Sequence, residues 1–243
     1  MYIYGRKPVA EALIEESTTV EKIYIRNSLN KNQVKAILQN ASRQKVPVSE
    51  VPGKKLYDLV GSVNDQGVVA LLSEADYMEL DEWLTAMKDV ANPALLLVDG
   101  VEDTHNIGAI IRSAAGAGMH GILLPKHGIA PITGGTYKAA AGNIGKVPLI
   151  RAGNLNQAIM ELKEHYFWIA GLDGEGETGL WNLDMSTPMA FIIGAEQDGI
   201  RPSTKKHCDF LVNIPLSNGV ESLNASVAAA LLAFEWKRRR GQS

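Results

Sequence analysis

From residue 93 onward, short apolar runs alternate with segments of helical periodicity. The apolar runs read ALLLVDG, GILLP, FWIAGLD, MAFIIGAE and FLVNIPL, and a last helix is expected from Asn224 to Arg240. This alternation predicts an α/β fold with a mostly parallel sheet and helices on both faces. Ligands of such sheets bind beyond the carboxyl ends of the strands, so the residues that follow each run are the first candidates for a site.

A smaller α/β domain is expected before this region, over residues 1–74. Lys22–Arg26 alternates like a strand, Lys31–Lys45 is patterned as an amphipathic helix, and Gly67–Leu72 is typical of a buried strand. An acidic stretch over residues 75–92 is expected to be a linker, and residues 93–243 form the second domain.

The charge balance limits how the chain can hold nucleic acid. It carries 24 basic and 27 acidic residues, and only residues 1–74 are net positive, with 10 Lys and Arg against 8 Asp and Glu. Binding by bulk electrostatics is therefore excluded, and any RNA contact must be local.

Composition also narrows the class of protein. With 46% hydrophobic and 21% charged residues the chain should fold as a globular protein. Its one cysteine, Cys208, rules out an intramolecular disulfide, and no metal site is expected. The reducing cytoplasm is the expected compartment. No run approaches the roughly 18 apolar residues that cross a bilayer, so no membrane contact is expected.

One glycine pattern suggests a nucleotide site and is rejected on its context. GEGETG at Gly174–Gly179 fits GxGxxG after a strand-like run. The motif works by aiming a helix N-terminus at a pyrophosphate, but Glu175 and Glu177 would repel that group and the residues that follow are not helical in pattern. A solvated turn is the preferred interpretation, and a nucleotide-dependent oxidoreductase is disfavoured.

Three other segments at predicted strand ends carry candidate site residues. The first, VDGVEDTHNIGAIIRSA, contains Asn106 and Arg112, which could equally be a helix cap and a surface charge. The second, FIIGAEQDGI, ends a strand in Gly194–Glu196 and continues to Gly199. Small residues there suit either a plain turn or a close approach of the backbone to a ligand.

The third segment, VNIPLSNGVESLNASVAAALLAFEW, leads from a strand through a loop into a long helix. Ser222 and Asn224 precede that helix, where both residue types cap helices well. A cap can also present polar groups to a substrate, so the two residues are candidates for a site.

Taken together, NIGAIIRSA, GAEQDG and NIPLSNGVESLNASVA resemble the three ordered motifs of the SpoU (TrmH-like) family of RNA ribose 2′-O-methyltransferases, within the SPOUT superfamily. YGRKPVAEAL and NDQGVVALL resemble the L30e-like RNA substrate-binding domain of that family. The resemblance implies a trefoil knot in the C-terminal domain, S-adenosylmethionine as cofactor, and RNA as substrate. The chain is most similar to the branch that methylates a guanosine of 23S ribosomal RNA.

Carried over by position, the resemblance assigns roles to the motif residues. Arg112 is implied as the group that activates the 2′-hydroxyl, with Asn106, Glu196, Ser222 and Asn224 orienting it. Because an arginine does not ordinarily lose its proton, an equal alternative is that it binds the adjacent phosphate and stabilises the developing alkoxide. The residues implied to hold the cofactor are Gly194, Ala195, Gly199, Ile214, Leu216, Ser222 and Leu223.

The resemblance also implies a homodimer packed through the knotted domains. An apolar stripe on the last helix, Val227, Ala230, Leu231 and Phe234, is a candidate for that contact, although such a stripe is more often intramolecular core. Where many relatives carry a glutamate, this chain has Gly145 followed by Lys146, so any role of that acid is in doubt. The terminal KRRR is expected to be a solvated helix end.

Three interpretations of function stay open. The N-terminal domain favours ribosomal RNA as substrate, because many transfer RNA enzymes of the family use short basic extensions instead. A transfer RNA ribose 2′-O-methyltransferase is the first alternative. The second is an RNA-binding or ribosome assembly factor that keeps the fold without turnover.

Overall fold

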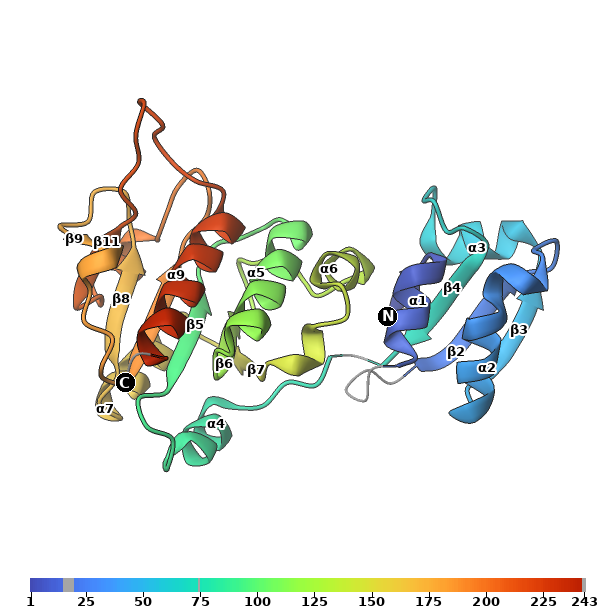
Figure 1. The fold of residues 1–243 in the computed structure, drawn as a ribbon, viewed down its shortest axis with the longest axis horizontal. Coiled ribbons are helices and arrows are strands. Elements are labelled where there is room, and N and C mark those ends of the chain that lie inside the picture. Colours follow the sequence, from blue (N-terminus) through green and yellow to red (C-terminus); the bar gives the residue numbers. More distant parts are fainter. Residues whose placement is uncertain (15–19, 74, 242–243) are drawn as a thin grey trace.

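The computed structural model describes residues 1–14, 20–73 and 75–241, which form two lobes (Figure 1). The smaller lobe is a four-stranded sheet in the order β1-β4-β2-β3 with helices packed on it, as the sequence predicted. Its core includes Ile3, Val9, Ile23 and Val68, all at most 1% exposed. Its elements are β1 (Tyr2–Tyr4), α1 (Arg6–Ala12), β2 (Val20–Arg26), η1 (Lys31–Val34), α2 (Lys35–Arg43), β3 (Val48–Val51), α3 (Gly53–Val60) and β4 (Val68–Leu72).

The larger lobe is built on a seven-stranded sheet in the order β7-β6-β5-β10-β8-β11-β9, whose neighbouring strands pair in parallel. The α/β prediction is confirmed. The elements are β5 (Ala94–Val98), α5 (Thr104–Ala117), β6 (Gly121–Pro125), α6 (Gly134–Ala140), η2 (Ile144–Lys146), β7 (Leu149–Ala152), α7 (Leu155–Glu164), β8 (Trp168–Leu172), β9 (Thr178–Gly179), η3 (Leu180–Asn182), β10 (Met189–Ile193), α8 (Pro202–Lys205), β11 (Phe210–Asn213) and α9 (Ala225–Arg240).

Helices cover both faces of this sheet because its central strands are apolar on both sides. Along β5, Leu96 and Val98 join the cluster under α5 and α9, while Leu95 and Leu97 join the cluster under α7 and α4 (Leu80–Met87). Every residue of β5 is buried, as expected of a central parallel strand. The carboxyl ends of β5 and β10 are left free to carry a site.

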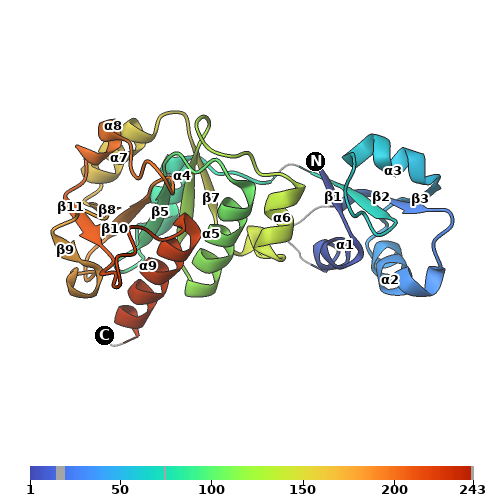
Figure 2. The ribbon, with the colours of Figure 1, turned by 90° about the horizontal axis from the view of Figure 1, so that it is seen from above.

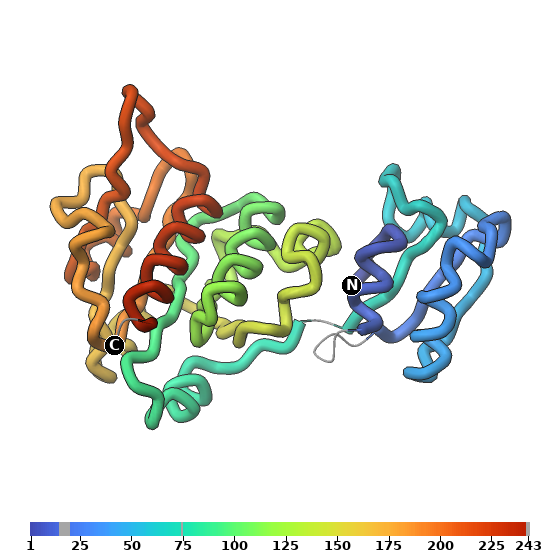
Figure 3. The backbone as a smooth tube through the Cα atoms, viewed as in Figure 1, coloured from blue at the N-terminus to red at the C-terminus, as the bar shows by residue number. Residues whose placement is uncertain are grey.

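The acidic stretch that the sequence marked as a linker contains helix α4 (Leu80–Met87), whose backbone runs beside the larger lobe (Figure 3). Its apolar side chains join the core on one face of the larger sheet. The Met78 amide donates to the Leu149 carbonyl at 3.0 Å, at the β7 edge. Trp83 is fully buried, and its Nε1 donates to the His120 carbonyl at 2.9 Å. Much of this stretch is therefore anchored to the larger lobe.

Helix α6 lies between the two lobes (Figure 2). A Cβ added at Gly134 would lie 2.4 Å from the Tyr2 carbonyl oxygen of β1, so glycine permits this close approach. Tyr137 packs against the cores of both lobes. On its other side α6 presses on α5, where a Cβ at Gly108 would lie 2.5 Å from the Thr136 carbonyl oxygen. One short helix thus connects the small lobe to the helix that carries the first motif.

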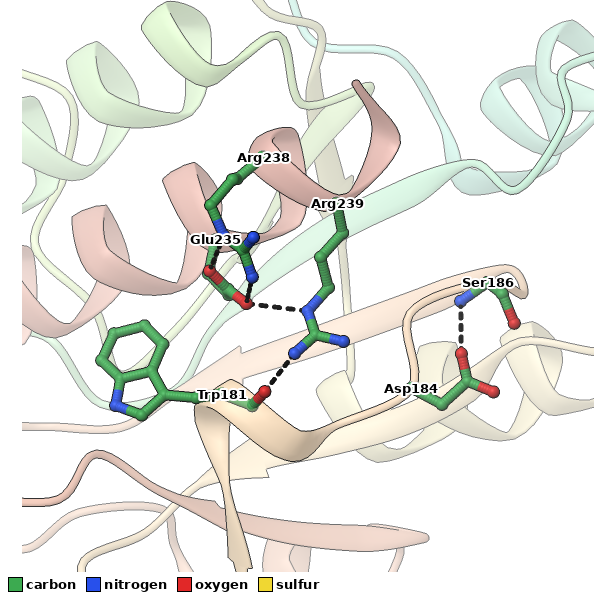
Figure 4. A network of polar contacts seen from close by, with 6 residues as sticks. All are labelled: Trp181, Asp184, Ser186, Glu235, Arg238 and Arg239. Carbon is green, nitrogen blue, oxygen red and sulfur yellow. Dashed lines mark hydrogen bonds and ion pairs between the residues drawn. The ribbon is translucent and has the colours of Figure 1, made fainter. Parts of the chain in front are cut away.

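The basic run at the end of α9 is largely exposed, as predicted for a solvated helix end, and two of its arginines also form ion pairs within the chain (Figure 4). The buried Glu235 carboxylate accepts hydrogen bonds from Arg238 and Arg239, and Arg239 also donates to the Trp181 carbonyl. Arg240 lies over the Trp236 ring at 4.9 Å. The contact of Arg239 with the Trp181 carbonyl joins the end of α9 to η3.

In the described part of the chain, no helix is both long and apolar enough to span a bilayer. The trefoil knot stays a prediction.

Candidate active site

Three predicted site residues from distant parts of the chain meet at the carboxyl edge of the large sheet. Glu196 lies in the turn after β10, Asn106 lies in the first turn of α5, and Asn224 immediately precedes α9. The Asn224 Nδ2 donates to Asn106 Oδ1 and to Glu196 Oε2, each at 3.0 Å. The side chains converge because β5 and β10 pair in parallel, which places the segments that follow them at the same edge.

The Asn224 amide has a fixed orientation. Its Oδ1 accepts from the Ser226 amide at 2.9 Å and from Ser226 Oγ at 2.6 Å, which makes it the N-cap of α9. With the oxygen turned toward the helix, the amino group has to face Asn106 and Glu196. The two interpretations of Asn224, helix cap and site residue, are therefore compatible.

The GAEQDG segment folds back on itself in a tight turn. Ala195 and Gly199 exchange two backbone hydrogen bonds of 3.0 Å. A Cβ at Gly194 would lie only 2.1 Å from the Gly199 carbonyl carbon, and Gly199 has a φ of +63°. Here the small residues let backbone approach backbone, and the turn forms one wall of a cavity.

That cavity, of about 530 Å³, opens beside the cluster, and Glu196 belongs to both. Its volume is in the range of small-molecule sites. It is lined by all seven residues predicted to hold a cofactor: Gly194, Ala195, Gly199, Ile214, Leu216, Ser222 and Leu223. The structure thus brings these residues together, and their role as cofactor ligands stays a prediction.

Polar residues that the sequence analysis did not select also line the cavity. Asp173 and Glu175 follow β8, and Lys205 ends α8. Lys205 Nζ lies 2.8 Å from Asp173 and 3.9 Å from Glu175, and its hydrogen bond to Asp173 raises the pKa of the lysine. Asp173 directly follows the apolar run FWIAGL, so a search of the residues that follow predicted strands could have found it.

The GEGETG segment begins with an exposed turn, as predicted. Gly174 and Glu175 are exposed, and both also line the cavity. A Cβ at Gly176 would lie 2.6 Å from the Leu211 backbone, which explains that glycine by packing. Strand β9 and the short η3 follow, so no helix N-terminus is available for a pyrophosphate.

Arg112 lies apart from the cluster. It is exposed on α5, six residues beyond Asn106, which corresponds to about 9 Å along the helix axis and a rotation of about 240°. Among the described residues none forms a hydrogen bond or ion pair with its side chain. Within a single chain Arg112 therefore lies in the middle of α5, whereas Asn106 lies in its first turn.

The pair Gly145 and Lys146, at which the sequence departs from the expected family pattern, lies in η2, beside α5. Both residues are exposed, and Lys146 Nζ donates to Asn143 Oδ1 at 3.2 Å. The two residues thus belong to a surface turn.

Comparison with known families accounts for both lobes. Residues 93–234 match the SpoU rRNA Methylase family, and residues 2–78 match the RNA 2′-O ribose methyltransferase substrate binding domain. A protein of Staphylococcus haemolyticus is 39% identical over 241 residues, covering 99% of this chain and 96% of the relative. Its name assigns it to the TrmH family of tRNA/rRNA methyltransferases.

Solved structures share the fold across both lobes. The SpoU methyltransferase AviRb from Streptomyces viridochromogenes, in complex with AdoMet, aligns with a TM-score of 0.83 at 22% identity, covering 100% of this chain and 91% of its own. The AdoMet-bound rRNA methyltransferase from Sinorhizobium meliloti aligns with a TM-score of 0.75 at 24% identity, covering 98% and 87%.

The matches of the two lobes to a methylase family and to its substrate-binding domain place the chain in the class of RNA ribose 2′-O-methyltransferases. The chain belongs to the SpoU rRNA methylase family.

Proposed function

We propose that the chain transfers the methyl group of S-adenosylmethionine to the ribose 2′-hydroxyl of a guanosine in 23S ribosomal RNA. The observation that carries the proposal is the cluster of Asn106, Glu196 and Asn224, of which Glu196 lines the cavity. The cluster holds a carboxylate in a fixed orientation next to a space of cofactor size.

The chemistry of the cavity fits a cationic nucleoside. Its apolar wall residues suit an adenine ring, and include Ile193, Ile200, Val212, Ile214 and Leu223. Its charged lining residues are Asp173, Glu175, Glu196, Asp198 and Glu221, against Lys205 alone. Excess negative charge favours a sulfonium and an ammonium and opposes a pyrophosphate. The oxidoreductase alternative is disfavoured again on this ground.

The side chains of the cluster would position the ribose. Bound S-adenosylmethionine supplies an electrophilic methyl carbon. Asn224 and Glu196, held in one orientation by their mutual hydrogen bond, would fix the 2′-hydroxyl in line with it, and positioning of this kind contributes several kcal/mol. Ser222 lies on the same wall, in the loop that leads to α9. Arg112 would bind the neighbouring phosphate and stabilise the developing alkoxide, and water or a substrate phosphate would take the proton.

We infer that a second copy of the chain brings Arg112 to the site. On α9, Val227, Leu231 and Phe234 are 47%, 36% and 49% exposed, so for these three residues the prediction of intramolecular core is wrong. A Cβ at Gly116 of α5 would contact the Phe234 ring at 3.6 Å. Arg112 and Gly116 are four residues apart on one helix and share this face. A homodimer packed here would direct Arg112 toward the partner's cavity.

The two-domain organisation supports ribosomal RNA over transfer RNA. We assign residues 1–74 to substrate binding, 75–92 to the linker and 93–243 to a knotted methyltransferase domain. The Sinorhizobium meliloti rRNA methyltransferase aligns with 98% of this chain, whereas the Aquifex aeolicus TrmH/SpoU tRNA modifying enzyme aligns with 67%, at a TM-score of 0.55. The names of the curated relatives include both substrates, so transfer RNA is the second candidate.

The test is transfer of labelled methyl groups from S-adenosylmethionine to unmodified 23S ribosomal RNA and to bulk transfer RNA in separate reactions. Digestion of the product should give labelled 2′-O-methylguanosine from the ribosomal RNA. Label in transfer RNA alone would overturn the assignment of ribosomal RNA as the substrate. Absence of label from both, with cofactor still bound, would favour the binding or assembly factor.

A further inference from the structure

Asp99, directly after β5, is a buried carboxylate that the site described above does not use. Its backbone amide continues the sheet by donating to the Ile193 carbonyl at 2.8 Å, and the residue is completely buried. Its Oδ2 accepts from the Arg201 amide at 3.0 Å. Its Oδ1 has no hydrogen-bond partner in the described part of the chain, and Arg201 Nε lies 3.6 Å away. The buried charge is thus balanced by Arg201.

The Arg201 guanidinium is held on two sides and open on the remaining one. Nη2 donates to the Gly128 carbonyl at 3.0 Å. Gly128 has a φ of +74°, and a Cβ there would lie 2.3 Å from Nη2, so glycine leaves room for the guanidinium. The Arg201 side chain is still 47% exposed. A charged group that is fixed in place yet accessible is suited to binding a ligand.

The position of Arg201 places it between the small lobe and the cavity. In the sheet order, β7 and β6 lie on one side of β5, while β10, β8 and β11 carry the cavity on the other. The loop after β6 presents exposed Lys126 and His127. Helix α6 follows this loop and contacts β1 of the small lobe (Figure 2). An RNA strand that extends from the small lobe to the cavity therefore crosses the loop where Arg201 binds Gly128.

We infer that Arg201 binds a backbone phosphate of the substrate RNA on this path, with Asp99 as the positioning residue that fixes it. The inference rests on the proposed function. A guanidinium is a planar fork that pairs with two phosphate oxygens at once. Among the described residues Nη1 has no hydrogen-bond partner, and Nη2 bonds to Gly128 alone. Lys126 adds a second positive charge along the same path of the RNA.

The test uses Arg201→Gln in the full-length protein, with the RNA pool that accepts methyl from the wild type. We expect the KM for RNA to rise about tenfold while kcat stays within about threefold of the wild type. The slope of log K for RNA binding against log salt concentration should decrease in magnitude by about one. The Kd for S-adenosylmethionine by calorimetry should stay unchanged. Lys206→Gln is the matched control, because Lys206 is exposed and its removal takes away one positive charge only five residues along.

Other outcomes separate the alternatives. If Arg201 has only a structural role, Arg201→Gln should lower the thermal midpoint and weaken cofactor binding. The salt dependence of RNA binding would then stay unchanged, and that result would overturn the inference. Asp99→Asn should raise the KM in the same direction but less than Arg201→Gln. If Arg201→Gln does not fold, Lys126→Gln tests the same path, and an unchanged KM and slope would refute it. A wild type that methylates no RNA would instead refute the proposed function.

Discussion

Helix α9 carries a polar network at each end, and the two differ in what they leave open. At its start, Asn224 bonds to residues of two other segments beside a cavity. Near its end, Glu235 is 5% exposed and is satisfied by Arg238 and Arg239 of the same helix, at 2.8 and 2.7 Å (Figure 4). The first network joins three segments of the chain and includes Glu196, which lines the cavity, while the carboxylate of the second is satisfied within one helix. Charge alone therefore does not mark a site; contact with a cavity does.

The largest effect is expected from Asn224→Asp. The carboxylate can still accept from Ser226 and cap α9, but it loses the amino group that binds Asn106 and Glu196. We expect kcat for methyl transfer to fall by about 100-fold or more, with the free energy of unfolding within about 1 kcal/mol of the wild type.

Asn154→Asp is the matched control, because the Asn154 side chain likewise caps a helix, by accepting from the Asn156 and Gln157 amides, and does not line the cavity. It should leave methyl transfer unchanged. Retained activity in Asn224→Asp would remove the cluster from the mechanism.

A smaller effect on activity is expected from Gly194→Ala. The new Cβ meets backbone at 2.1 Å, so the turn from Ala195 to Gly199 has to shift. Affinity for S-adenosylmethionine, measured by calorimetry, should fall about tenfold, with a loss of roughly 1 to 3 kcal/mol in stability. Gly174 lines the same cavity, and a Cβ added there would have no atom within 4 Å. Gly174→Ala should therefore bind S-adenosylmethionine with unchanged affinity. Equal affinity in both variants would contradict this account of the turn.

The smallest effect on activity is expected from Glu235→Gln, which changes stability alone. The variant should lose roughly 1 to 3 kcal/mol in urea unfolding, because two arginines lose their carboxylate partner. Turnover per folded chain should not change. A selective loss of turnover would erase the distinction between the two ends of α9.

The same variant has a predictable pH dependence. Hydrogen bonds from Arg238 and Arg239 lower the pKa of Glu235 from 4.5 to about 2. A lowered pKa stabilises the folded state above the unfolded value, so the stability gap between wild type and Glu235→Gln should be constant above about pH 5. It should shrink as the pH falls from 4.5 toward 2. A gap that widened in acid would show that the ion pairs are not its source.

Local patterns predicted the parts of the fold that depend on local physics. The strand at Ala94–Val98 and the helix after Asn224 follow from apolar runs and a cap, and both are confirmed. The contact of Asn224 with Asn106, 118 residues apart, arises from strand order, which no local pattern encodes. Arg112 lies apart from Asn106 because helical rotation places residues six apart on different sides of a helix. The contacts of the basic run depend on Glu235, whose burial is a tertiary property.

The central claim is that methyl transfer takes place where the start of α9 meets Arg112 of a second copy. Subunit complementation tests it most directly, with Arg112→Ala and Asn224→Ala chains carrying different tags, co-expressed and purified as mixed dimers. Each variant alone should be inactive. In a mixed dimer one site receives both substitutions and the other receives neither, so we expect about half of wild-type activity. Mixed dimers as inactive as the parents would show that Arg112 does not act across the interface.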